Sequence, residues 1–210
     1  APSVVSAFLA ATATKVSYYV LLRLLFSVFG AAFVFGTMHL DALLVPLALV
    51  AMFFGSIAAI YQTNLKRVLA YSSVAQVGYM TLAIGFNSIT GLTGGLVHLF
   101  NHAVMKGGLF LVVGCISFSV GTVEVNDLKG LGKRRPWLMI AFLLGGLSLI
   151  GVPGTVGFVS KWYLVLGALE KGWYAVAAAI VLSSLLALIY IWRLVELAWF
   201  HEPAEGVEMK

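Results

Sequence analysis

The chain has 210 residues, of which 61% are hydrophobic and 10% are charged. A soluble domain carries about 25% charged residues, so this composition excludes an ordinary soluble enzyme and indicates an integral membrane protein. The formal net charge of +5 does not indicate nucleic-acid binding, because the basic residues are divided between short loops and single positions in apolar segments. One cysteine, Cys115, provides no disulfide framework. Because the chain starts Ala-Pro without a signal peptide, we expect a fragment of a longer protein.

Six apolar segments are long enough to cross a bilayer, which takes about 20 residues. They are residues 3–30, 41–61, 66–86, 91–119, 136–168 and 173–200. Most connections between them are short, but residues 120–135 form a longer polar one, and Pro136 after it suits the first turn of a helix. The predicted fold is an all-α integral membrane bundle of six transmembrane helices, followed by a polar tail at 201–210.

The basic residues predict the orientation. Lys66 and Arg67 border the second connection, and residues 129–135 add four more lysines and arginines, whereas the opposite connections hold Lys171. Basic loops remain on the cytoplasmic side of a membrane. We therefore expect both ends of the chain to face the cytoplasm, in the cytoplasmic (inner) membrane of a bacterium or archaeon.

Five ionisable side chains lie within the predicted spans. His98, His102 and Lys106 are spaced by four residues, so they nearly stack on one helix face over about 12 Å. Lys15 and Lys161 lie in other spans. Ionisable groups at this depth are costly and mark ion or proton paths. A neutral imidazole both donates and accepts, and desolvation favours release of a lysine proton. We interpret these five residues as a proton relay.

Structural interpretations compete with this one. Lys15 is also compatible with a fixed ion pair or a subunit contact, and the histidines with hydrogen-bonded packing. Two histidines four residues apart can share a metal, but no third carboxylate or thiolate ligand is near them in the sequence, so no metal site is expected. Lys66 is either a basic topology anchor or a candidate mouth of the path.

A helix break is predicted shortly before Lys161. Gly151, Pro153, Gly154 and Gly157 fall within seven residues and should interrupt the span. Broken helices expose backbone groups and mark ion sites in transporters, although a tolerated kink is the simpler alternative. The nearby buried lysine favours an ion site.

Signatures of soluble enzymes are missing from the sequence. It has no phosphate-binding loop, no dinucleotide fingerprint after a strand, no cysteine cluster and no nucleophile elbow. No cofactor is expected, and the chain by itself should neither bind NADH nor carry electrons. It would take part in an enzymatic reaction only as a subunit of a larger translocase.

Several motifs resemble one family of membrane subunits. They are APSVVSAFLAATATKVSYYVLLRL, NLKRVLAYSSVAQVGYM, HLFNHAVMKGGLFLVVG, DLKGLGKRRP and LSLIGVPGTVGFVSKWYLVLGALE. In this order they are similar to the antiporter-like subunits shared by Mrp-type cation/proton antiporters and respiratory complex I. Within that family the resemblance is greatest to the D-type subunit of the Mrp antiporter.

The resemblance implies a fourteen-helix fold with two inverted five-helix repeats. Residues 3–30 would be the last helix of the first repeat, and residues 41–200 the second repeat. By position, Lys15 matches the central lysine of the family and Lys161 its terminal charged residue. His98, His102 and Lys106 match the family's polar relay between these two lysines. Lys66 matches a family lysine at the cytoplasmic end of its helix.

The function implied is exchange of protons for a monovalent cation, Na⁺ or K⁺, in a multisubunit antiporter embedded in lipid. One alternative is a proton-pumping membrane subunit of NADH:quinone oxidoreductase (complex I) or of a related membrane-bound hydrogenase. A second alternative is a structural subunit that packs its complex and transports nothing. The three differ in whether cations, an electron donor or neither drives proton movement.

Overall fold

The computed structural model describes residues 3–121 and 123–202, which form helices joined by short links. The longer helices are α1 (Ser3–Arg23), α2 (Asp41–Ile60), α3 (Leu65–Gly85), α4 (Ile89–Val120), α6 (Pro136–Ile150), α7 (Val156–Glu170) and α8 (Tyr174–Phe200). The short elements are π-helical turns at Leu24–Phe29 and Ala32–Thr37, a 3-10 turn at Val125–Leu128, and α5 (Leu131–Arg134). Most of the predicted polar tail, from residue 203 onward, lies outside the described residues.

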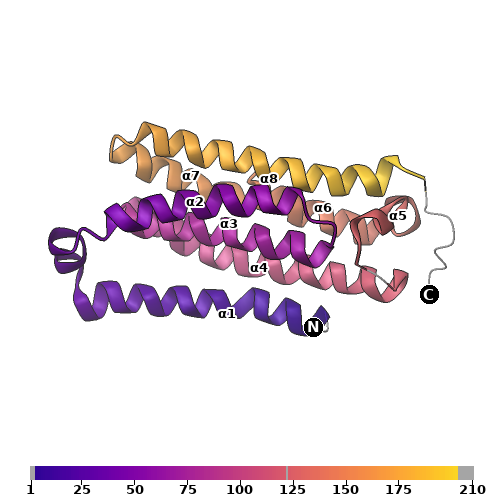
Figure 1. The fold of residues 1–210 in the computed structure, drawn as a ribbon, viewed down its shortest axis with the longest axis horizontal. Helices are drawn as coiled ribbons and strands as arrows, with labels where there is room; N and C mark the ends of the chain where they lie inside the picture. Colours follow the sequence, from indigo (N-terminus) through magenta and orange to yellow (C-terminus); the bar gives the residue numbers. More distant parts are fainter. Residues whose placement is uncertain (1–2, 122, 203–210) are drawn as a thin grey trace.

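Five helices in the described ranges are long and apolar enough to cross a membrane: α1 with its π-helical continuation to Phe29, then α2, α3, α4 and α8. This agrees with the predicted all-α membrane architecture. The predicted span at 136–168 is divided into α6 and α7, which lie one after the other along the bundle (Figure 1). The interruption, residues 151–155, falls inside the range where glycines and a proline predict a broken helix.

Local sequence explains where several helices begin and end. Asn64, Ser88 and Thr155 accept hydrogen bonds from backbone N–H groups in the first turns of α3, α4 and α7, as N-cap residues do. Pro136 occupies the first turn of α6, where its missing N–H costs nothing. Gly121 ends α4 in the left-handed conformation, with φ of +83°.

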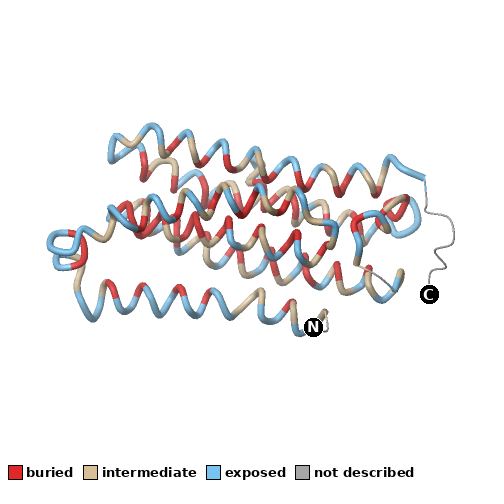
Figure 2. The backbone as a smooth tube through the Cα atoms, viewed as in Figure 1, coloured by how far each residue is buried: buried red, intermediate tan, exposed pale blue. Residues whose placement is uncertain are grey.

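Helix α4 is the centre of the bundle. It packs against α1, α3, α6 and α7, and α1 and α8 form opposite edges of the view in Figure 1. Buried residues gather on the faces that these helices turn toward one another, while the outer faces of α1 and α8 are exposed (Figure 2). The exposed side chains are largely apolar, for example Phe8 on α1 and Leu185 on α8, as suits contact with lipid.

Two connections far apart in the sequence meet at one end of the bundle. The Leu65 N–H donates to the Val123 carbonyl at 2.8 Å, and the Val125 N–H donates to the Thr63 carbonyl at 2.7 Å. Lys66, at the start of α3, therefore lies at the same end as the basic segment 129–135. The basic residues that predict the orientation share one end of the molecule.

Candidate functional site

The candidate site is the row formed by Lys15, His98, His102, Lys106 and Lys161, called the polar row below. All five side chains are buried, and His98, His102 and Lys106 are fully so. His98, His102 and Lys106 lie on the face of α4 that turns into the bundle, as their four-residue spacing predicts. The other two come from helices that pack against α4.

Lys106 is held by α3. Its Nζ atom donates to the carbonyl oxygen of Leu69 at 2.7 Å and also donates to the Ser72 hydroxyl. The Ser72 hydroxyl itself donates to Leu69 O at 3.0 Å. Because that serine hydrogen is already engaged, Ser72 accepts from the lysine. Two acceptors for Lys106 suit either a neutral amine or an ammonium with one further hydrogen.

The two histidines continue the row along α4. Their rings are stacked, with centroids 6.0 Å apart and planes inclined by 5°. Nδ1 of His98 lies 2.9 Å from the Ser160 hydroxyl of α7. Nε2 of His98 and both ring nitrogens of His102 have no hydrogen-bond partner among residues 3–121 and 123–202. Of the four ring nitrogens, one thus has a hydrogen-bond partner within the described ranges.

Gln76 of α3 adds two more buried polar atoms without a hydrogen-bond partner in the described ranges, close to the histidines. Ser72, Gln76 and Tyr79 share one face of α3; Ser72 bonds Lys106, and the Tyr79 ring lies 5.8 Å from the His98 ring. Gln76 is fully buried between those two contacts, which places it level with His102. Neither amide atom of Gln76 has a partner in the described part of the chain. Buried polar groups without partners are rare and call for an explanation.

Lys161 lies against the helix break. Its Nζ donates to the carbonyls of Leu149 at 3.1 Å and Ile150 at 2.8 Å, and to the Ser184 hydroxyl at 3.0 Å. The Ser184 hydroxyl donates to its own helix at Ile180 O, so it accepts from the lysine. Three acceptors match the three hydrogens of an ammonium. The carbonyls at the end of α6 also carry the negative end of the helix dipole.

The break itself depends on close backbone approach. Gly151 ends α6 with φ of +89°, and a Cβ on Gly157 would overlap the Ser148 carbonyl oxygen. The Ser148 hydroxyl accepts from the Gly157 N–H at 3.2 Å. Asn101 of α4 donates to Val156 O at 2.7 Å and holds the start of α7. The glycines that predict the break therefore allow α6 and α7 to meet beside Lys161.

Lys15 belongs to α1, and its Nζ atom donates to Ala10 O of its own helix. The position of Lys15 relative to α4 follows from two close approaches between α1 and α4, one before Lys15 in the chain and one after it. A Cβ on Gly107 would lie 3.4 Å from Ala11 Cβ, and one on Gly95 would lie 3.1 Å from the Tyr18 hydroxyl. Because α1 and α4 are antiparallel (Figure 1), Lys15 lies near the level of the histidines.

Lys66 is separate from the polar row. It lies in the first turn of α3, half-buried, with its N–H bonded to the Asn64 side chain at 3.1 Å. Asn64 in turn donates to Glu124 at 3.1 Å. One turn further along α3, the carbonyl of Leu69 binds Lys106. Lys66 thus stands at the basic end of the bundle, on the helix that leads to Lys106.

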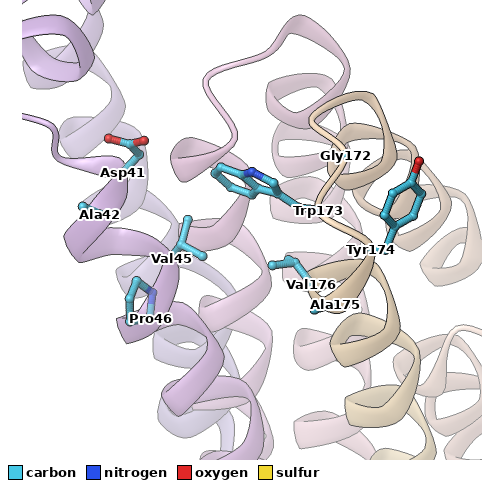
Figure 3. A pocket seen from close by; sticks show the side chains of 9 residues that line it. All are labelled: Asp41, Ala42, Val45, Pro46, Gly172, Trp173, Tyr174, Ala175 and Val176. Atoms are coloured by element: carbon cyan, nitrogen blue, oxygen red, sulfur yellow. The ribbon is translucent and has the colours of Figure 1, made fainter.

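Two surface grooves lie outside the polar row. One, of about 520 Å³, is lined by the start of α2 and the link into α8, including Asp41, Val45 and Trp173. Figure 3 shows the Trp173 ring between the two helices, with the Asp41 carboxylate at the mouth. The other groove, of about 780 Å³, is lined by residues of α1 and α4 and by Arg135. No residue of the polar row lines either groove.

The fold and the site define a polytopic helical membrane protein with a buried row of ionisable side chains beside a broken helix. A family model described as "NADH:quinone oxidoreductase/Mrp antiporter, TM" matches residues 1–187. The chain therefore belongs to this family of membrane subunits, in agreement with the resemblance of its motifs.

Individual relatives come from both branches of the family. The N subunit of the NADH-quinone oxidoreductase of Desulforudis audaxviator is 47% identical over 199 residues, which cover 94% of this chain and 39% of the relative. The D-type subunit of a Na(+)/H(+) antiporter of Alkalihalophilus pseudofirmus is 31% identical over 207 residues, 99% of this chain and 41% of the relative. The chain thus spans about two fifths of the length of these curated relatives.

Solved structures of membrane complexes have the same fold. A chain of the membrane-bound sulfane sulfur reductase, an archaeal respiratory membrane complex, matches with a TM-score of 0.86 and 30% identity over 98% of this chain and 43% of that chain. A chain of the Mrp complex from a Dietzia species matches with a TM-score of 0.75 and 31% identity over 80% of this chain and 33% of that chain.

Proposed function

We propose that this chain is part of a proton-translocating membrane subunit of a multisubunit respiratory complex. The observation that carries the proposal is the continuous placement of buried ionisable groups, from Lys15 on α1, along α4, to Lys161 at the break between α6 and α7. Such groups are retained in a membrane where ions or protons move. In this proposal protons reach Lys15, pass along the α4 groups Lys106, His102 and His98, and leave from Lys161, which lies beyond the Tyr79 ring from His98.

Between the two branches, the identities support the redox-driven one. The 47% identity to the N subunit of an NADH-quinone oxidoreductase exceeds the 31% identity to the D-type subunit of an antiporter. We therefore place electron-transfer-driven pumping before cation/proton antiport, which is the second candidate. In both cases the partners are other membrane subunits and lipid, and the cations moved are protons, with Na⁺ or K⁺ added in the antiport case.

The hydrogen bonds suggest how a proton is distributed along the row. Lys161 has three acceptors and suits the charged form, whereas Lys106 has two and suits either form. Charging one group raises the cost of charging its neighbour, so a proton at one end is felt along the row. Loss of the Lys161 proton would favour protonation of the next group.

The gap between Lys106 and His98 needs a mobile carrier. Gln76 and His102 present uncommitted polar atoms there. A water molecule with two to four such partners completes this kind of connection in protein interiors. Gln76 does not titrate, so its role in the proposal is to hold the carrier beside the His102 ring.

The wider architecture is part of the proposal. We take α6 and α7 together as the fifth of six spans and residues 3–30 as the last helix of a first repeat. Residues 41–200 are then a second five-helix repeat, and the whole protein is a fourteen-helix subunit. The end that bears Lys66, Arg67 and residues 129–135 is assigned to the cytoplasm of a bacterium or archaeon. The opposite end carries Lys171 in a turn and Arg23 in the last turn of α1, so the basic excess supports this orientation.

Proton movement in inverted membrane vesicles that contain the parent complex tests the function. NADH should acidify the vesicles, and Lys15→Ala should abolish this acidification in fully assembled complex. Collapse of an imposed pH gradient on addition of Na⁺ or K⁺, without an electron donor, would instead support the antiporter. A normal rate in the Lys15→Ala complex would exclude the relay and leave a structural subunit.

A further inference from the structure

Ser160 on α7 is a fully buried serine that precedes Lys161 and contacts the polar row through His98. Its Oγ atom lies 2.9 Å from Nδ1 of His98. The same Oγ lies 3.0 Å from the carbonyl oxygen of Gly157, in the first turn of α7 after the break. One hydroxyl therefore joins α4 to the start of the helix that carries Lys161.

The number of hydrogens available determines the direction of both bonds. A serine hydroxyl has one hydrogen, and a carbonyl oxygen can only accept. The Ser160 hydrogen therefore points to Gly157 O, and the Ser160 oxygen accepts from His98. The hydrogen in the bond between the two side chains belongs to Nδ1 of His98. Neutral His98 is then the Nδ1–H tautomer, and its Nε2 carries a lone pair.

The surroundings of Nε2 suit uptake of a proton. This atom is buried and has no hydrogen-bond partner in the described ranges. The neighbouring His102 ring is stacked on it at an inclination of 5°. Ring nitrogens bond in the plane of the ring, so stacked rings do not exchange a proton directly. A proton that reaches His98 arrives in the ring plane, at the Nε2 lone pair.

We infer that Ser160 is a positioning residue of the relay, which holds His98 in the tautomer whose Nε2 is open to a proton. This inference rests on the proposed proton path. When a proton binds to Nε2, the ring becomes an imidazolium, and Nδ1–H continues to donate to Ser160 in a stronger, charge-assisted bond. The proton later leaves from Nε2, and the serine keeps its own hydrogen throughout.

Nitrogen NMR of the assembled complex, labelled with ¹⁵N-histidine, tests the tautomer. Loss of signals in His98→Gln identifies the His98 nitrogens. The expected result is a protonated Nδ1 and an unprotonated Nε2 in the unsubstituted complex. In Ser160→Ala the ratio of the two tautomers should shift about fivefold toward Nε2–H, the factor given by a net hydrogen bond of about 1 kcal/mol.

Transport measured on the same samples links the tautomer to function. Proton translocation in Ser160→Ala should fall in proportion to the population of the Nδ1–H tautomer, by at most about fivefold. Ser160→Thr, which keeps the hydroxyl, should restore both the tautomer and the rate. Thr81→Val is the matched control, because it removes a hydroxyl that donates at 3.0 Å to Val77 O of its own helix, α3. This control should leave both readouts unchanged.

Separate outcomes overturn the inference and the proposed function. An Nε2–H tautomer in the unsubstituted complex overturns the role of Ser160 whatever the variants do. An unchanged tautomer and rate in Ser160→Ala, while His98→Gln stops translocation, overturns it too and leaves the path intact. Unchanged translocation in both His98→Gln and Lys15→Ala overturns the proposed function itself.

Discussion

The Nζ atom of Lys161 lies over the ring of Tyr79, 4.7 Å from the ring centroid. The same ring lies 5.8 Å from the ring of His98. Tyr79 of α3 is fully buried and thus separates the last lysine of the polar row from the histidines of α4. A ring face attracts a cation most strongly where water is excluded, so Tyr79 stabilises the charged form of Lys161.

The first prediction concerns this ring. Tyr79→Leu should destabilise the assembled subunit by about 2–4 kcal/mol, because it removes the ring face from Lys161 and leaves a cavity. Tyr79→Phe keeps the ring and loses two long hydroxyl contacts, to Ile180 O at 3.4 Å and Ser184 at 3.3 Å. It should cost about 1 kcal/mol or less. Thermal unfolding of the complex measures both, and equal costs would contradict the role of the ring.

The second prediction concerns the helix break. Gly157→Ala would place a Cβ on top of the Ser148 carbonyl oxygen, so α6 and α7 must separate and Lys161 must lose its carbonyl acceptors. We expect a loss of about 3 kcal/mol or more, with little assembled protein. Gly108→Ala on α4 is the control, because its Cβ meets nothing within 4 Å. That variant should be neutral or slightly stabilised. Normal assembly of Gly157→Ala would contradict the close approach of Gly157 to the Ser148 carbonyl at the break.

Much of the helical framework could be predicted from the sequence. The sequence predicts spans at residues 41–61 and 173–200, and the helices are Asp41–Ile60 and Tyr174–Phe200, because apolar runs end at polar turns. The stretch between α1 and α2 is less predictable. Its apolar residues continue past Arg23 without a polar boundary and form π-helical turns up to Thr37. A hydrophobicity pattern does not distinguish such turns from a longer helix or from a loop.

The partners of the polar row could not be predicted. Four-residue spacing is sufficient to place His98, His102 and Lys106 on one face, but Ser72, Ser160 and Ser184 reach the row by contacts between helices. Serines in apolar helices usually bond a carbonyl of their own helix, and these three do so. Their second bonds, to the row, depend on which helices lie side by side. Sequence reasoning also missed Gln76, although it lies four residues from Ser72 on the same face of α3.

The third prediction concerns Lys15. Its Nζ atom donates to Ala10 O within α1, so Lys15→Ala removes a hydrogen bond inside one helix and none between the described helices. The variant should assemble to normal levels and lose proton translocation. Lys171→Ala, at an exposed position in the link between α7 and α8, is the matched control and should retain both. Native gels of the membranes measure assembly, and vesicle acidification measures translocation. Loss of assembly in Lys15→Ala would favour the structural role.

The fourth prediction separates transport from packing at Lys106. Methionine has nearly the length of lysine and fills a similar space without a charge. In Lys106→Met the Leu69 carbonyl stays bonded, because the hydroxyls of Ser72 and Ser73 both donate to it at 3.0 Å. Stability should therefore change by about 1 kcal/mol or less, while translocation is lost because no proton can reside at this position.

Leu109→Ala is the comparison for Lys106→Met. Leu109 is buried on the same helix, one turn further along, and its truncation should cost about 2–5 kcal/mol. Enough of that variant should remain folded to translocate protons at a normal rate per assembled complex. Lys106→Met should thus lose transport and keep its stability, whereas Leu109→Ala should lose stability and keep its transport rate. Thermal unfolding measures stability, and vesicle acidification measures transport. If Lys106→Met instead destabilised the complex as much as Leu109→Ala and kept its transport rate, Lys106 would be a packing residue and the path would not pass through it.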